Sequence, residues 1–213
     1  MKSKIYYFLI ALLLYTSSLH AQLGIRVGLN TASEIKKFDQ QAISDGFNSK
    51  NLTGYQIGLV YQAMPKQSGI GCEIGALLTQ KGSSYTDSTD VNSFKEGYTE
   101  LNYLEVPFNV RYRLNLGLVG IYGIAGIYGG YALNGKVVQE NPVVPDQNEA
   151  FSSFMDHVDY GYNLGAGIEL FKKIQFGATW SQGLKNTANS STSLPVPKTV
   201  LNRAFTVNLA YMF

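Results

Sequence analysis

Eight charged residues recur at polar positions of segments that are apolar at every second residue. Acidic and basic groups are balanced among them. In an enclosed interior each would have to pair or coordinate something, because an unpaired buried charge is costly. We interpret them as a salt-bridge network that plugs a closed interior; the alternative is a polar channel or proton path. The eight residues are Arg26, Glu73, Lys81, Glu105, Arg111, Arg113, Asp159 and Glu169.

Enzyme chemistry has little support in the remaining residues. After the predicted leader described below, His157 is the only histidine, and Ser153 and Asp156 lie near it in sequence. A serine–histidine–acid group at the rim of a barrel is one hypothesis, but a single histidine near serines is expected by chance. The segment "DSTDVN" (87–92) lacks the glycine and the terminal glutamate of a calcium loop. We predict no catalytic residues, no metal and no cofactor.

The segments that carry the charges alternate apolar and polar residues with a period of two, which is typical of β-strands. Long polar stretches (about 31–53, 82–98, 135–157 and 185–199) alternate with tight turns at "PKQSG", "NLG" and "KK". This layout predicts an all-β fold, an eight-stranded antiparallel up-and-down transmembrane β-barrel, with the long loops outside and both termini in the periplasm. The predicted strands are 23–30, 54–63, 70–81, 103–114, 118–133, 159–170, 174–182 and 205–213, and the orientation of 118–133 is ambiguous because it is apolar on both faces.

The composition of the two faces distinguishes a membrane barrel from a soluble one. A soluble barrel keeps its apolar face inside. Here the apolar face carries almost no charge, and its aromatic residues gather near both strand ends, as expected at two bilayer interfaces. The other face is rich in Gly, Asn, Gln and Thr, which suits the narrow interior of an eight-stranded barrel. We therefore expect outer-membrane lipid around the barrel and the charged residues inside it.

Residues 1–21 have the pattern of a secretory signal peptide. Two lysines precede the apolar run Ile5–Tyr15, and a small-residue exit ends at Ala21. The run is shorter than the roughly 20 residues of a membrane helix, and a buried N-terminal helix is the alternative interpretation. Cleavage after Ala21 would leave a single domain, the outer-membrane β-barrel of residues 22–213.

Net charge and cysteine content exclude two further features. The formal net charge is +2, close to neutral, so we expect no nucleic-acid partner. Cys72 is the only cysteine, which excludes an internal disulfide framework.

The chain ends in "TVNLAYMF", which continues the alternation up to Phe213. A barrel must pair its last strand with its first to remove both sheet edges. The segment resembles the C-terminal signal that the barrel assembly machinery reads in the outer membrane. The residues of this signal share one face: Val207, Leu209, Tyr211 and Phe213.

Four segments together resemble the PorT-like outer-membrane β-barrel proteins of Bacteroidota, a porin family. They are "LGIRVGLN" after the leader, "LNYLEVPFNVRY", "DYGYNLGAGIEL" and the terminal "LAYMF". The resemblance covers essentially the whole mature chain. It implies a small barrel of mostly unassigned function, with some members tied to secretion or gliding machinery, and it supplies no catalytic residues.

Two hypotheses for function follow. The first is a monomeric barrel with a plugged polar lumen and a structural or interaction role in the cell envelope, for example as an accessory to a secretion or envelope assembly. Its outer loops would bind envelope proteins or extracellular ligands, because long loops often carry recognition. The second is a small passive pore for ions or small solutes.

Overall fold

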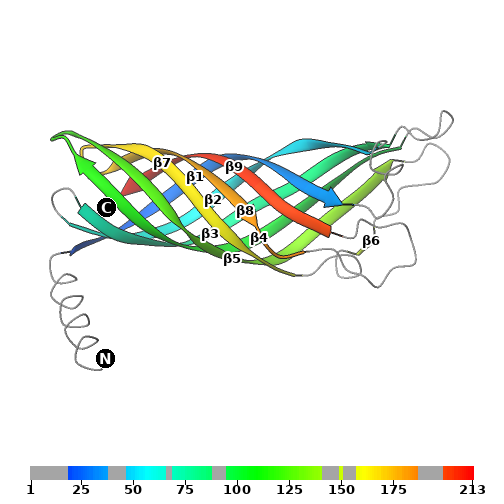
Figure 1. Ribbon diagram of the computed structural model, residues 1–213, viewed down its shortest axis with the longest axis horizontal. Helices are drawn as coiled ribbons and strands as arrows, with labels where there is room; N and C mark the ends of the chain where they lie inside the picture. The colour runs from blue at the N-terminus through cyan, green and yellow to red at the C-terminus, as the bar shows by residue number, and fades with distance from the viewer. Residues whose placement is uncertain are drawn as a thin grey trace, which may run out of the picture.

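Eight long antiparallel strands close on themselves in the computed structural model (Figure 1). It describes residues 19–37, 47–65, 69–87, 95–140, 149–150, 157–186 and 199–213. The predicted leader up to residue 18 lies outside these ranges. The strands are β1 (Leu19–Lys37), β2 (Phe47–Pro65), β3 (Gly69–Asp87), β4 (Lys95–Asn115), β5 (Val119–Glu140), β6 (Glu149–Ala150), β7 (Val158–Leu170), β8 (Ile174–Gly183) and β9 (Thr199–Met212).

Each long strand pairs with its neighbours in the chain, and β1 pairs with β9 to close the barrel. The two-residue strand β6 only adds to the outer part of β5. The predicted eight-stranded antiparallel barrel is therefore confirmed. Among the described residues, no helix has the length and apolarity to cross a membrane.

Most strands are longer than the apolar pattern predicts. At the loop end β1 continues to Lys37, where it still pairs with Thr199 of β9, and β4 pairs with β5 as far as Glu96 and Glu140. Much of the polar sequence at 31–53, 82–98 and 135–157 is thus strand and not loop. Ladder hydrogen bonds join backbone atoms, so a strand can continue where its side chains no longer face lipid.

The outer surface of the barrel is apolar and its interior is polar. Leu29, Ile57 and Val106 project outward and are exposed, whereas Asn30, Gln62 and Glu105 project inward and are buried. The ambiguous strand β5 turns Tyr122, Ile124 and Tyr128 into the barrel and Ile121, Ile127 and Tyr131 toward lipid.

The seam between β1 and β9 starts just beyond the predicted cleavage site. Residues Leu19–Ala21 pair with β2, while the first bond to the last strand joins the Phe213 N–H to the Leu23 carbonyl. Loss of residues 1–21 would therefore leave the seam whole. All four residues of the predicted assembly signal lie in this seam with exposed, outward side chains.

The short turns lie at the end of the barrel that also holds the C-terminus (Figure 1). In the β4–β5 turn, Gly117 has a φ of 91°, a region that glycine adopts without steric cost. In the β7–β8 turn, Phe171 and Lys172 have φ of 53° and 60°. They are the central residues of a turn in which the Lys173 N–H donates to the Leu170 carbonyl oxygen at 3.0 Å, and two successive positive φ angles match the twist of a hairpin.

Candidate functional site in the barrel interior

Glu73 on β3 is the centre of the first group of charged side chains. Its Oε2 accepts hydrogen bonds from Arg26 Nη2 at 2.8 Å and from Gln62 Nε2 at 2.7 Å. Arg111 Nη1 donates to the same oxygen at 3.1 Å. Asn109 Nδ2 donates to Oε1 at 3.3 Å. One carboxylate thus receives donors from β1, β2 and β4.

Glu169 on β7 extends this group toward the turn end. Its Oε1 accepts from Arg113 Nη1 at 2.9 Å, and its Oε2 accepts from Gln175 Nε2 at 2.9 Å. Arg111 Nη2 lies 3.7 Å from Oε2, so this guanidinium links the two carboxylates. Gln62 and Gln175 join the halves through reciprocal amide bonds of 3.0 Å. We call the eight side chains the Glu73 cluster: Arg26, Gln62, Glu73, Asn109, Arg111, Arg113, Glu169 and Gln175.

The Glu73 cluster draws its side chains from six of the eight long strands. Its members come from β1, β2, β3, β4, β7 and β8. Glu73 and Arg111 have zero relative exposure, as does Gln175. Side chains that lined an aqueous pore would be in contact with water. These three side chains have no exposed surface.

An aromatic ring from β5 completes the layer. The Arg111 guanidinium lies 3.4 Å from the centroid of the Tyr122 ring, a cation–π contact. The ring fits because Gly167 and Gly177 face it: a Cβ at either glycine would lie 2.4 Å from the Tyr122 hydroxyl oxygen. These two glycines of β7 and β8 are thus required by the close approach of a side chain.

Lys81 is the centre of a second group, nearer the loop end. Its Nζ lies 2.5 Å from Glu105 Oε1 and 3.7 Å from Asp159 Oδ2. Asp159 Oδ2 also accepts from Asn202 Nδ2 at 2.9 Å and from the Tyr128 hydroxyl at 3.2 Å. The Lys81 ammonium lies 4.5 Å from the centroid of the Tyr128 ring. We call Lys81, Glu105, Tyr128, Asp159 and Asn202 the Lys81 cluster.

The two clusters carry opposite formal charges. The Glu73 cluster has three guanidinium groups and two carboxylates, a balance of +1, whereas the Lys81 cluster has one ammonium and two carboxylates, a balance of −1. Together they are neutral. Charges in a low-dielectric interior interact over longer distances than in water, so the two imbalances compensate each other along the lumen.

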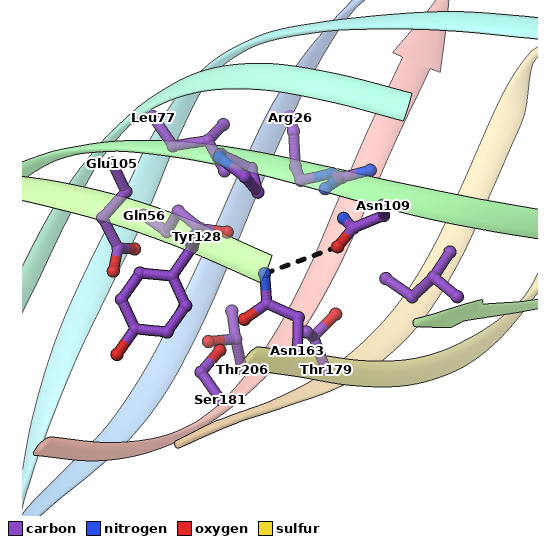
Figure 2. Close-up of a pocket in the computed structure, with 12 residues that line it drawn as sticks. Arg26, Gln56, Leu77, Glu105, Asn109, Tyr128, Asn163, Thr179, Ser181 and Thr206 are labelled. Carbon is purple, nitrogen blue, oxygen red and sulfur yellow. Dashed lines mark hydrogen bonds between the residues drawn. The ribbon is translucent and has the colours of Figure 1, made fainter. Parts of the chain in front are cut away.

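A small polar cavity separates the clusters (Figure 2). The volume in which the centre of a water molecule could lie is about 20 Å³. Figure 2 shows Glu105 and Tyr128 on one side and Arg26 and Asn109 on the other. Asn163 donates across it to Asn109 Oδ1 at 3.5 Å, while its own Oδ1 has no hydrogen-bond partner among the described residues. A polar cavity of this volume has room for a water molecule.

All eight charged residues that the sequence singles out lie inside the barrel, in two clusters rather than one. Three amides that bridge charged residues of the Glu73 cluster lie on the predicted polar faces but were not assigned a role from the sequence: Gln62, Asn109 and Gln175. Tyr122 and Tyr128 were not assigned a role either, because β5 is apolar on both faces. A polar residue directly across a strand pair from a charged one is the signal that could have found the amides, as with Gln62 opposite Glu73.

His157 directly precedes β7, two residues before Asp159 of the Lys81 cluster. Its ring stacks on Tyr131 with centroids 5.6 Å apart, and its Nδ1 lies 3.3 Å from the Ala132 carbonyl oxygen. Ser153 and Asp156 lie outside the described residues. The absence of catalysis therefore stays a prediction. Within the described part of the chain, no three His, Cys, Asp or Glu side chains group as metal ligands would.

A closed antiparallel barrel with an apolar outer surface and a charged interior defines a transmembrane β-barrel of the outer-membrane type. The family model "Outer membrane protein beta-barrel domain" matches residues 16–189, and the chain belongs to this family. The protein therefore lies in the outer membrane, as the sequence predicts. No curated protein matches the sequence.

Solved outer-membrane barrels share the fold at low sequence identity. OprG from Pseudomonas aeruginosa is 16% identical, with a TM-score of 0.49 over 92% of this chain and 97% of that one. Ail of Yersinia pestis is 15% identical, with a TM-score of 0.45 over 91% and 99%. The outer membrane enzyme PagL is 12% identical, with a TM-score of 0.41 over 85% and 98%. At these values the likeness concerns the fold alone.

Proposed function

We propose that this protein is a closed outer-membrane barrel whose lumen is plugged, with a structural or interaction role in the envelope rather than a transport role. The observation that carries the proposal is the Glu73 cluster. It crosses the lumen with side chains from six strands, and its central carboxylate has no contact with water.

The energetics of the cluster also favour a closed lumen. To open a path at this level, Glu73 would have to part from Arg26, Arg111 or Gln62, its partners at 2.7–3.1 Å. Removal of one partner from a buried ion pair costs about 3–5 kcal/mol, because the other charge stays buried and unpaired. A thermal opening at this cost would be rare.

A liposome-swelling assay tests the proposal. We expect vesicles with the wild-type protein to swell in small sugars no faster than vesicles without protein. The double variant Glu73→Ala/Arg111→Ala removes the two fully buried members of the central pair and should swell faster. Rapid swelling with the wild type would contradict the proposal, and this arm does not depend on whether the variant folds.

A small passive pore is the second candidate. The polar cavity between the clusters, lined by Ser181, Thr179 and Thr206 among others, favours it because it provides part of a hydrated path. Conduction would require the Glu73 cluster to rearrange. Swelling that is fast for wild type and slow after a bulky substitution such as Ser181→Phe would support this candidate instead.

The interaction role would belong to the loop end. The strands β1 to β5 continue there beyond the apolar band, so that paired backbone extends toward the loops. We propose that the protein is a monomer and that this end of it binds envelope proteins or extracellular ligands. We also propose that its relatives are the PorT-like barrels of Bacteroidota. A secretion or envelope assembly would then be the partner. Cross-linking in cells from a cysteine placed at an outer strand end tests this, and adducts only with lipid would contradict it.

A further inference from the structure

Arg203 of β9 is an exception on the outer surface of the barrel. Its side chain points outward and is exposed, on the same face as Phe205 and Val207. Among the strand residues whose side chains the structure describes, it is the one basic residue that faces lipid. A basic group on this surface must lie where the membrane can accommodate its charge.

The position of Arg203 along the strand places it at the level of lipid headgroups. It lies ten residues before Phe213, whose exposed ring is at the turn end. With a rise of about 3.3 Å per residue and a tilt of about 40°, ten residues span about 25 Å along the barrel axis, the height of the apolar band. The loop end of an outer-membrane barrel faces outward. Arg203 therefore lies at the outer-leaflet interface.

The neighbouring strand fixes the orientation of the guanidinium. Gln182 of β8 lies directly opposite Arg203, is largely buried, and accepts a hydrogen bond from Arg203 Nε at 3.1 Å. Neither Nη atom has a partner among the described residues. As far as the described residues go, the terminal nitrogens form a free pair, the geometry with which arginine binds a phosphate through two hydrogen bonds.

The residues around Arg203 change from polar to apolar in the direction of the membrane. Ser33 of β1 pairs with it on one side, and the next outward residues toward the turn end are Phe205 and Trp180, which pair with each other. Trp180 packs edge-on against Tyr162 with centroids 5.5 Å apart. A polar headgroup contact directly above an aromatic surface is the arrangement that a lipid with a charged head and acyl chains requires.

We propose that Arg203 binds a phosphate of a phosphorylated lipid in the outer leaflet. Gln182 holds the guanidinium, and Phe205 and Trp180 contact the acyl chains of the same lipid. The site is independent of the lumen and of its closure, so it goes beyond the proposed function.

Native mass spectrometry of the refolded protein with added lipid tests the site. The probes are bisphosphorylated lipid A, the same lipid without phosphates, and inorganic phosphate. We expect the wild type to retain bisphosphorylated lipid A. The affinity of Arg203→Gln for this lipid should be lower by a factor of about ten or more, since a hydrogen bond to a charged group contributes at least about that factor. Arg203→Lys keeps the charge without the paired nitrogens and should be intermediate. The matched control Lys172→Gln removes a charge at the opposite end and should bind as the wild type does.

Three results would overturn the proposal. Arg203→Gln could bind bisphosphorylated lipid A as tightly as the wild type. The wild type could bind the phosphate-free lipid equally well. Inorganic phosphate could displace the lipid at equal concentration, which would make the site one for the free anion. The comparison of lipids uses only the wild type, so it decides even if Arg203→Gln does not fold.

Discussion

At the scale of single residues, the excess charge of each cluster decides which substitutions the barrel tolerates. The Glu73 cluster has one more cation than anions, so loss of its carboxylate and loss of one guanidinium are not equivalent. Without Glu73 three cations face Glu169 alone, whereas without Arg111 the remaining two cations and two carboxylates balance. The Glu73 cluster should therefore depend most on its acidic members, and the Lys81 cluster, with the opposite excess, on its lysine.

The first prediction follows from this asymmetry. Glu73→Gln should lower the free energy of unfolding by about 3–5 kcal/mol, and Arg111→Met by less, although Arg111 is the larger side chain. Urea unfolding in lipid vesicles, followed by the change in gel mobility between folded and unfolded protein, measures both. The exposed turn residue Lys172, changed to Gln, is the control and should alter stability by less than about 0.5 kcal/mol. Equal losses for Glu73→Gln and Lys172→Gln would contradict a stabilising network.

A second prediction concerns the 2.5 Å pair in the Lys81 cluster. Lys81→Met leaves Glu105 and Asp159 as two buried carboxylates without a cation, and should destabilise the barrel more than Glu105→Gln does. In the double variant the loss should be smaller than the sum of the single losses by about 1 kcal/mol or more, because the two residues interact. Additive losses in the same unfolding assay would show that the pair is not coupled.

At the scale of the strands, the sequence predicts the alternation and the closure but not the full length of the pairing. The period-two pattern identifies all eight barrel strands, because lipid outside and a narrow polar lumen inside leave a strict chemical difference between the faces. The pattern weakens where the strands leave the membrane, since both faces then meet water. In β5 it fails for another reason: Tyr122 and Tyr128 are inside although they are aromatic, because glycines on β7 and β8 leave space for them.

The packing of Tyr122 gives a third prediction. A methyl group at Gly177 would meet the Tyr122 hydroxyl oxygen at 2.4 Å but no backbone atom closely. Gly177→Ala should therefore cost about 1–3 kcal/mol by overpacking, and Tyr122→Phe in the same chain should restore most of the loss by removing that oxygen. Gly129→Ala is the control, since a Cβ there meets nothing within 4 Å. The same urea assay reports all four proteins, and a loss that Tyr122→Phe does not relieve would refute the packing argument.

A fourth prediction concerns the last strand. We propose that the outward residues Val207, Leu209, Tyr211 and Phe213 are read by the assembly machinery. Phe213→Ala should then reduce the amount of folded barrel in the outer membrane of cells but leave refolding of the purified protein into detergent unchanged. Phe176→Ala removes an outward aromatic residue of β8 and is the control. Equal amounts of both variants in the outer-membrane fraction would argue against a terminal signal.

At the scale of the whole molecule, the eight-stranded barrel has a narrow lumen that contains eight charged side chains. These charges must neutralise one another. An eight-stranded barrel has an interior just wide enough for side chains to fill. The sequence identifies the charged residues that lie inside it, because each occurs on the polar face of a predicted strand. Their division into two clusters could not be predicted, since it depends on the stagger between strands and on neutral amides such as Gln62 and Gln175.

Single-channel recording of the refolded protein in a planar bilayer tests the closed lumen most directly. We predict a silent bilayer for the wild type under conditions in which the inserted protein is folded, and openings only when Glu73 and Arg111 are both replaced by Ala. Steady, reproducible openings of the wild type, with a size that changes in Glu73 or Arg111 variants, would contradict the plug and show that these residues line a pore.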